Sequence, residues 1–257
     1  MVKILYYIII IMKVLKVKDP SEKYKIKHKL FDIPFSLILV GKSELSGKSN
    51  FCTWLLLSDN AGYKDVWDGE NIYIVSPSLR TDYKLQVIVS QLDIPKGNLI
   101  EQYDEQLLES IYEMIEEEYE EAINDKKKPK QSLIIFDDMS FGKKLKKKGS
   151  IIEKIFCNGR HNLISVITTT QAYTSLLTEC RENSKAMVLF DMSDRQLERV
   201  IDDHSTMGSK AFKKMFRDTA SQKKHSFMVV NYSNKNSERF LDSEFRPIDI
   251  NKYKKKK

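Results

Sequence analysis

The sequence predicts an α/β fold with a mostly parallel sheet flanked by helices. Short, uninterrupted apolar runs such as "SLILV" (residues 36–40) and "SLIIF" (132–136) are typical of strands buried on both faces. The segments between these runs carry apolar residues at helical spacing. Because buried strands that alternate with helices pair in parallel, the pattern indicates a parallel α/β sheet.

Three regions are predicted along the chain. Residues 1–35 form a leader and a small N-terminal β addition, because residues 14–18 and 24–31 alternate apolar and basic side chains as half-buried strands do. Residues 36–250 form one domain, since no internal repeat and no Gly/Ser-rich linker divides them. Residues 251–257, "NKYKKKK", form a basic tail.

The elements of the domain follow from the same patterns. The strand at residues 36–40 leads through a loop into a helix at 48–58. Further strands are expected at residues 71–76, 132–136, 163–168 and 186–190, with an edge strand at 226–232. The acidic stretch 101–125 is an amphipathic helix with a solvated face, because its apolar residues recur at helical spacing.

Composition indicates a soluble chain, and its positive charge fits either an acidic partner or a generally lysine-rich proteome. The 257 residues include 41% hydrophobic and 31% charged residues, and the net charge of +7 suits nucleic acid. The three cysteines and four histidines form neither a zinc pattern nor a disulfide framework, so a reducing compartment is expected. The apolar run at residues 4–12 is about half a membrane span, and no cleavage site follows it. We therefore expect no stable membrane insertion, and either Met1 or Met12 as the true start.

The stretch "LILVGKSELSGKSNF", residues 37–51, predicts a phosphate-binding loop between a buried strand and a helix. The usual pattern is Gly, four residues, then Gly-Lys-Ser or Gly-Lys-Thr, but Gly41 lies one position too early relative to Gly47. The extra residue lengthens the first half of the loop and places Glu44 and Leu45 where small residues are usual. The second half is intact, so the loop is expected to bind nucleotide.

The expected ligands of the nucleotide are backbone and side-chain groups of this loop. Backbone N–H groups at a helix N-terminus bind phosphate without particular side chains, so Gly41, Ser46, Gly47 and Asn50 are candidate contacts. Lys48 would reach the β- and γ-phosphates of ATP, and Ser49 would hold Mg²⁺.

Acidic and amide side chains follow two other predicted strands. In "LIIFDD", Asp137 ends an apolar run, where it can help to hold the metal, and Asp138 can position or activate the attacking water. In "GRHNLISVITTTQ", the strand ends in three threonines and Gln171, which can touch both the γ-phosphate and the water. Taken alone, Asp137-Asp138 is more often a strand-to-turn boundary and Gln171 a polar residue at a helix start. Together with the loop, the two features predict an ATPase site.

These motifs, "VGKSELSGKS", "LIIFDDM" and "GRHNLISVITTTQ", resemble those of FtsK/HerA superfamily P-loop ATPases. Within the superfamily, residues 36–191 are most similar to the genome-packaging ATPases of large DNA viruses, poxviruses and virophages. The resemblance implies a RecA-like core that assembles into a ring and pumps double-stranded DNA into a capsid. It also implies roles by position: Lys48 and Ser49 as phosphate and Mg²⁺ ligands, Asp137 as the metal carboxylate, Asp138 as the catalytic acid and Gln171 as the γ-phosphate sensor.

A ring ATPase also needs a cation from the next subunit. Arg160, Arg181 and Arg195 are candidates, and Arg160 could equally orient the turn before its own strand. The basic run "GKKLKKKGS", residues 142–150, could grip DNA phosphates in a pore or be a solvated surface loop.

The leading functional hypothesis is an ATP-driven double-stranded DNA translocase that packages a viral genome, with capsid or portal-vertex proteins as partners. The expected location is the viral assembly site in the host cytoplasm, or the virion. A helicase or conjugation-type DNA pump is the alternative with the same core. An inactive, nucleotide- and DNA-binding structural subunit is the alternative from another class.

Overall fold

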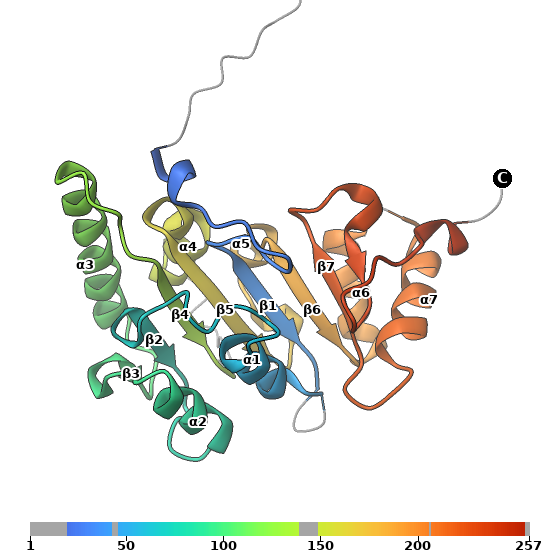
Figure 1. Cartoon of the computed structure of the whole chain (residues 1–257). Coiled ribbons are helices and arrows are strands. Elements are labelled where there is room, and N and C mark those ends of the chain that lie inside the picture. Colours follow the sequence, from blue (N-terminus) through green and yellow to red (C-terminus); the bar gives the residue numbers. More distant parts are fainter. Residues whose placement is uncertain (1–19, 43–45, 139–148, 206, 255–257) are drawn as a thin grey trace, which may run out of the picture.

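The structure, a computed structural model, describes residues 20–42, 46–138, 149–205 and 207–254. Within these residues eight strands form one sheet in the order β3-β2-β4-β5-β1-β6-β7-β8 (Figure 1). The strands from β3 to β6 in this order pair in parallel, whereas β7 pairs antiparallel with both β6 and β8. The strands are β1 (Ser36–Val40), β2 (Ile72–Val75), β3 (Leu99–Ile100), β4 (Ser132–Phe136), β5 (Ile164–Thr170), β6 (Ala186–Phe190), β7 (Phe227–Asn231) and β8 (Phe240–Leu241).

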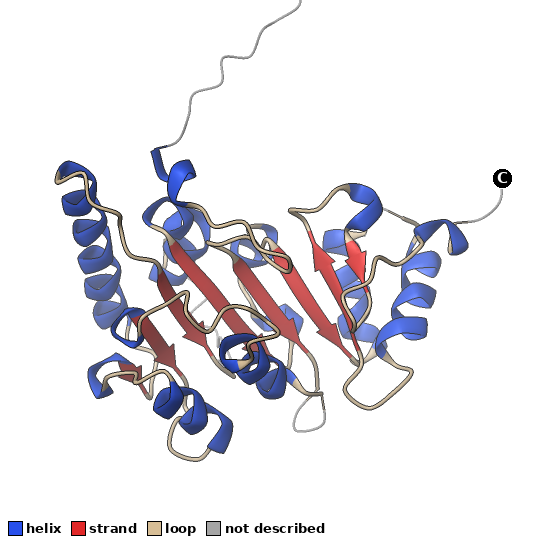
Figure 2. Ribbon diagram, in the orientation of Figure 1, coloured by secondary structure: helices blue, strands red, loops and turns tan. Residues whose placement is uncertain are grey.

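Helices cover both faces of the sheet (Figure 2). They are α1 (Lys48–Leu57), α2 (Tyr83–Gln91), α3 (Glu105–Asn124), α4 (Ile151–Asn158), α5 (Thr178–Glu182), α6 (Asp194–His204) and α7 (Ser209–Ala220). The central strand β1 shows the two layers: Leu37 and Leu39 pack with α1 and α2, and Ile38 and Val40 pack with the other helices. Successive side chains of a strand are thus buried alternately in the two hydrophobic cores, one on each face of the sheet. This arrangement confirms the predicted α/β class.

The predicted strands of the core all form, with ends shifted by no more than two residues. The strand at residues 226–232 is observed as β7, but it is not the edge of the sheet, because β8 pairs with it. Two residues are too few to show an alternating pattern, so β8 and β3 had no sequence signal. The acidic helix is α3, which begins after Asp104, whose carboxylate accepts from the N–H of Leu107.

The N-terminal β addition is smaller than predicted. Residues 14–18 lie outside the described residues, and within 24–31 the only ladder contact is an isolated antiparallel bridge of Ile26 with Ile33. Phe31, Ile33 and Phe35 are nevertheless buried in the core cluster that contains α1. The alternation of apolar and basic side chains therefore indicated correctly that one side of this segment is buried. A β-strand also needs a hydrogen-bonded neighbouring strand, and Pro34 has no backbone N–H to donate to such a neighbour.

The parallel register determines where the candidate site lies. Val40 is level with Thr170, and Phe136 is level with Thr168, so β1, β4 and β5 end at the same edge of the sheet. The segments that follow these strands carry the predicted site residues. None of the described helices is both long enough and apolar enough to span a membrane.

Candidate functional site

The phosphate loop is anchored to its neighbours at its start. The N–H of Gly41 donates to the carbonyl of Thr170 at 3.2 Å. A Cβ at Gly41 would lie 2.7 Å from the Cβ of Phe190 and 2.8 Å from that of Ser46, so only glycine fits. Gly41 thus serves close packing of the loop. Glu44 and Leu45, the residues of the extended half, lie outside the described residues.

The second half of the loop turns directly into α1. Gly47 has φ 97°, a left-handed conformation that favours glycine, and its carbonyl accepts from Phe51 at 2.8 Å. The first residues of α1 are Lys48, Ser49 and Asn50, whose N–H groups have no acceptor within the helix. Such a turn concentrates donors and the positive end of the helix dipole, which is the usual arrangement for binding phosphate.

Lys48 lies inside this turn with only 8% of its surface exposed. Its Nζ donates to the carbonyls of Gly41 (2.8 Å) and Lys42 (2.9 Å) and to Oγ of Ser46 (3.2 Å). Burial lowers the pKa of Lys48, and the nearby carboxylates of Asp138 and Asp137 act in the opposite direction. The ammonium group is therefore held at the loop, between the backbone donors and the two acids.

Asp137 follows β4 and is 5% exposed. Its Oδ1 accepts from Thr169 Oγ1 at 2.7 Å, and its Oδ2 accepts from Ser76 Oγ at 3.2 Å. Burial raises the pKa of Asp137, while these two hydrogen bonds lower it. The hydroxyls of the neighbouring strands thus fix the orientation of the carboxylate.

Asp138 and Gln171 lie in contact, as the motifs suggested. The Nε2 of Gln171 donates to Oδ1 (2.9 Å) and Oδ2 (3.1 Å) of Asp138. Asp138 has φ 46°, and its N–H donates to Thr169 Oγ1 at 2.9 Å. Both side chains are exposed, so the acid and the amide can meet a water molecule together.

These groups share one cavity of about 550 Å³. Among the residues that line it are Ser46, Gly47, Lys48, Ser49, Asp137, Asp138 and Gln171. The structure therefore brings together three motifs that are up to 125 positions apart in the sequence, from Ser46 to Gln171. Asn50 is outside this group and lines a separate aromatic hollow next to it.

Sequence reasoning missed three polar residues that act on Asp137. The Thr169 hydroxyl connects Asp137 to the backbone of Asp138. Ser76 supports Asp137 from the end of β2, and Asp82 adds a third carboxylate whose charge raises the pKa of Asp137. Only Thr169 had a signal, the run of three threonines before Gln171.

The donors present fit a magnesium ion. Mg²⁺ prefers oxygen ligands and is commonly held by one or two protein groups together with phosphate oxygens and water. The Ser49 hydroxyl and the Asp137 carboxylate line the same cavity, so these two residues would hold it. No group of three or more His, Cys, Asp or Glu side chains in the described part of the chain could hold a metal ion.

The three candidate arginines occupy different places. Arg160 lies in the short helix Gly159–Asn162 before β5, at the opposite edge of the sheet, and its Nε contacts His161. Arg181 is 13% exposed and paired with Asp203. Arg195 is exposed on the first turn of α6, at the edge that carries the site. It makes no hydrogen bond or ion pair with any residue that the structure describes.

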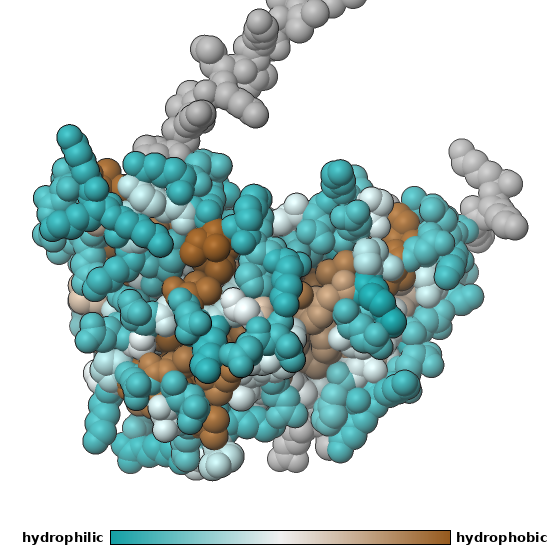
Figure 3. Space-filling view, in the orientation of Figure 1, coloured by the Kyte–Doolittle hydropathy of each residue, from teal (hydrophilic) through white to brown (hydrophobic). Residues whose placement is uncertain are grey.

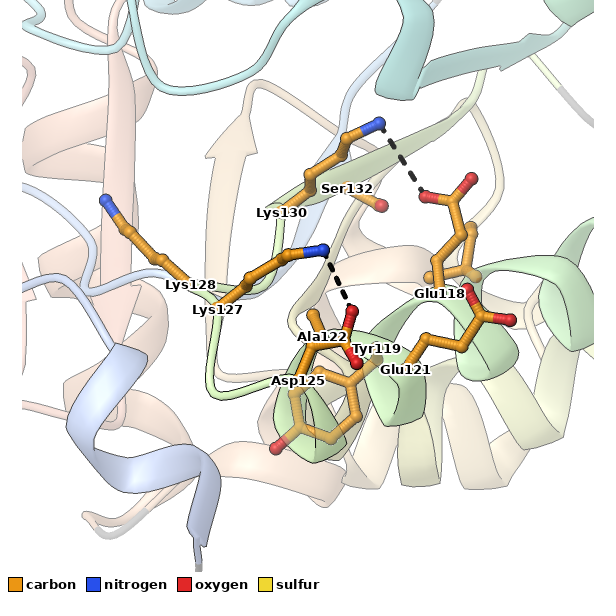
Figure 4. A pocket seen from close by; sticks show the side chains of 10 residues that line it. Glu118, Tyr119, Glu121, Ala122, Asp125, Lys127, Lys128, Lys130 and Ser132 are labelled. Carbon is orange, nitrogen blue, oxygen red and sulfur yellow. Dashed lines mark hydrogen bonds and ion pairs between the residues drawn. The ribbon is translucent and has the colours of Figure 1, made fainter.

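A second hollow, of about 270 Å³, lies where α3 ends and β4 begins (Figure 4). Two of its lysines face acids: Lys127 pairs with Asp125 at 2.8 Å, and Lys130 with Glu118 at 3.9 Å. Because β4 starts here and ends at Phe136, next to Asp137, this hollow is at the opposite edge from the ATPase motifs. Its charges compensate each other, so it is not a candidate phosphate site.

Comparison with known proteins assigns this chain to a family. Residues 22–245 match the family described as Poxvirus A32 protein. The chain belongs to that family. Membership of the poxvirus A32 protein family confirms the resemblance to genome-packaging P-loop ATPases that the motifs indicated. No curated protein matches the chain.

Solved structures show the same fold. The genome packaging NTPase B204 from Sulfolobus turreted icosahedral virus 2, in complex with AMPPCP, is 17% identical, with a TM-score of 0.53 over 83% of this chain and 97% of that chain. The sulfate complex is 16% identical, with a TM-score of 0.55 over 85% and 98%. These matches confirm that this chain, a member of the poxvirus A32 protein family, has the fold of a P-loop NTPase.

Proposed function

We propose that this P-loop ATPase is a motor that uses ATP hydrolysis to translocate double-stranded DNA and so packages a viral genome into a capsid. The observation that carries the proposal is the meeting of Lys48, Asp138 and Gln171 around one cavity. Family membership supports the same conclusion. The B204 neighbours are themselves described as genome packaging and DNA-packaging enzymes.

The residues have separate roles in the proposed hydrolysis. The N–H groups at the start of α1 and the Lys48 ammonium bind the β- and γ-phosphates and stabilise the charge that develops there. Asp138 accepts a proton from the attacking water, and Gln171 holds that water and senses the γ-phosphate. Mg²⁺, held by Ser49 and Asp137, would neutralise charge on the phosphate oxygens.

The proposed partners follow from charge and from the chemistry of ring ATPases. The net charge of +7 favours a polyanion such as double-stranded DNA, and we include the basic run 142–150 in that contact. Its residues 142–148 lie outside the described residues. We propose a homo-oligomeric ring that docks on capsid or portal-vertex proteins at the viral assembly site in the host cytoplasm.

DNA-stimulated turnover is the experiment that tests the motor. ATP hydrolysis is expected to rise several-fold with double-stranded DNA, and the stimulation is expected to fall steeply as salt is raised, because phosphate contacts release counterions. Equal turnover with and without DNA would contradict translocation. Unwinding of a forked duplex would favour a helicase instead.

Arg195→Ala is expected to lower the turnover of the assembled, DNA-stimulated protein by about 10³-fold, because an arginine from the next subunit stabilises the transferred phosphoryl group. ATP binding to the single chain is expected to stay unchanged. Arg199→Ala, one turn further along α6 and 4.0 Å from Asp202, is the matched control.

Mixing subunits tests whether this arginine acts in trans. Arg195→Ala and Lys48→Ala subunits are each inactive alone, but a mixed ring contains interfaces with an intact site and an intact arginine. Turnover should therefore recover on mixing. A normal rate for Arg195→Ala together with a loss for Arg160→Ala would assign the role to Arg160.

A further inference from the structure

An aromatic hollow of about 250 Å³ lies beside the phosphate loop, on the side away from Asp138. Its walls come from three separate parts of the chain: Trp54 on α1, His225 and Phe227 at the start of β7, and Phe245 in the segment after β8. Figure 3 shows apolar surface in this part of the molecule, between α1 and β7. The nucleotide chemistry described above uses none of these aromatic residues.

The rings form an apolar surface over a buried floor. Phe51 and Phe190 are 5% and 1% exposed and close the bottom. Trp54 and Phe245 stack with centroids 5.6 Å apart and an interplanar angle of 22°. Trp54, Phe227 and Phe245 are half-buried and so keep accessible ring surface. Planar apolar walls of this kind suit a planar ligand.

Two of the aromatic residues have left-handed backbone conformations, which are unusual for bulky side chains. His225 has φ 67° and Phe245 has φ 59°. The turn of Phe245 is held by Asp242, whose carbonyl accepts from Phe245 and whose Oδ1 accepts from Glu244 and Arg246. Strained conformations of this kind persist where the surroundings enforce them, and they gather at ligand sites.

The hollow is continuous with the phosphate loop. Gly47 lines both the aromatic hollow and the 550 Å³ cavity, and a Cβ on Gly47 would lie 3.2 Å from Nδ1 of His225. Asn50, directly after Ser49, lines the aromatic hollow as well. A nucleotide whose last phosphate points to Asp138 therefore leaves the loop past Gly47 and Asn50, toward these rings.

We propose that the aromatic hollow binds the base of the nucleotide, by stacking on Trp54 and Phe245. This inference rests on the proposed ATPase function. The polar side chains that line it are few: the Asn50 amide, the exposed imidazole of His225 and the Ser243 hydroxyl, none of which hydrogen-bonds to another described residue. Stacking on a π face does not depend on the base edge, so the site accepts adenine and guanine with similar affinity.

Binding of ATP, GTP and inorganic tripolyphosphate, each with Mg²⁺, separates the base site from the phosphate site. Wild type is expected to bind ATP and GTP about 5- to 150-fold more tightly than tripolyphosphate, the range for one stacked base. Phe245→Ala is expected to remove most of this difference while leaving the tripolyphosphate affinity unchanged. Phe245→Tyr, which keeps a ring, is expected to retain it.

Tryptophan fluorescence gives a direct second readout, because the chain has only two tryptophans and Trp67 is buried elsewhere in the core. ATP should quench the emission of wild type, tripolyphosphate should not, and Trp54→Phe should remove the ATP response. An equal loss of ATP and tripolyphosphate binding in Phe245→Ala, or no loss of either, would overturn the base site. A wild type that binds neither ligand would instead overturn the proposed ATPase function.

Discussion

Lys48→Ala is expected to reduce ATP turnover by about 10²–10³-fold or more, because it removes an ammonium group that lies at the phosphate loop, close to the two acids. Lys48 donates to the carbonyls of Gly41 and Lys42 and to Ser46, so its ammonium group is held at the loop and would exchange one or more of these hydrogen bonds for the phosphates. ATP affinity should fall together with the turnover, since the same charge contacts the ground state.

The fold should survive this change. Hydrogen bonds from the ammonium are lost, but the cost of burying a charge is lost with them, so the free energy of unfolding is expected to change by only about 1–2 kcal/mol. Thermal unfolding of the variant measures this change directly. It separates a loss of chemistry from a loss of structure.

Lys42→Ala is the matched control in the same loop. Lys42 is an exposed lysine whose Nζ pairs with Asp191 at 3.0 Å, a surface contact that contributes little. Its backbone carbonyl, which accepts from Lys48, is retained in the variant. Turnover near that of wild type is expected. If wild-type turnover is no greater than the background seen with Lys48→Ala, the lengthened loop does not bind nucleotide as proposed, and the inactive structural subunit is favoured.

The sheet was predictable because its strands are buried on both faces. A continuous apolar run such as Ile134–Phe136 records that environment in the sequence itself, so existence and position were right to within two residues. Strand order was not predictable, because it depends on which distant strands pair. Only the register, for example Val40 with Thr170, shows that three motifs end at one edge.

The sequence predicted those candidate residues whose type and position after a strand are typical of an ATPase site. Lys48, Asp137, Asp138 and Gln171 each follow a strand end, and the parallel order brings them to one cavity. Thr169 and Ser76 were not predicted, because serine and threonine are common in or after strands and carry no specific signal. Only the folded chain brings both hydroxyls within hydrogen-bond distance of Asp137. The aromatic hollow escaped for the same reason, since Trp54 and Phe245 are remote in sequence.

Asp138→Asn is expected to keep ATP binding and to lower turnover by about 10²–10⁴-fold, the usual contribution of a general base. The substitution is nearly isosteric, and asparagine tolerates the φ of 46° at this position as well as aspartate does. The backbone N–H that donates to Thr169 is unchanged, and the amide oxygen of the new side chain can still accept from Gln171. What disappears is the negative charge that takes the proton from water.

Comparison with the Asp137→Asn variant distinguishes the roles of the two acids, Asp137 as metal ligand and Asp138 as proton acceptor. Asp137 is buried, fixed by Thr169 and Ser76, and lies with Ser49 in the cavity, so its loss should weaken Mg²⁺-dependent nucleotide binding as well as turnover. Binding measured with and without Mg²⁺, beside single-turnover hydrolysis, distinguishes the variants. If Asp138→Asn also loses Mg²⁺-dependent binding, Asp138 is a metal ligand or a structural residue, and the proton must be accepted by another group of the cavity, such as Asp82.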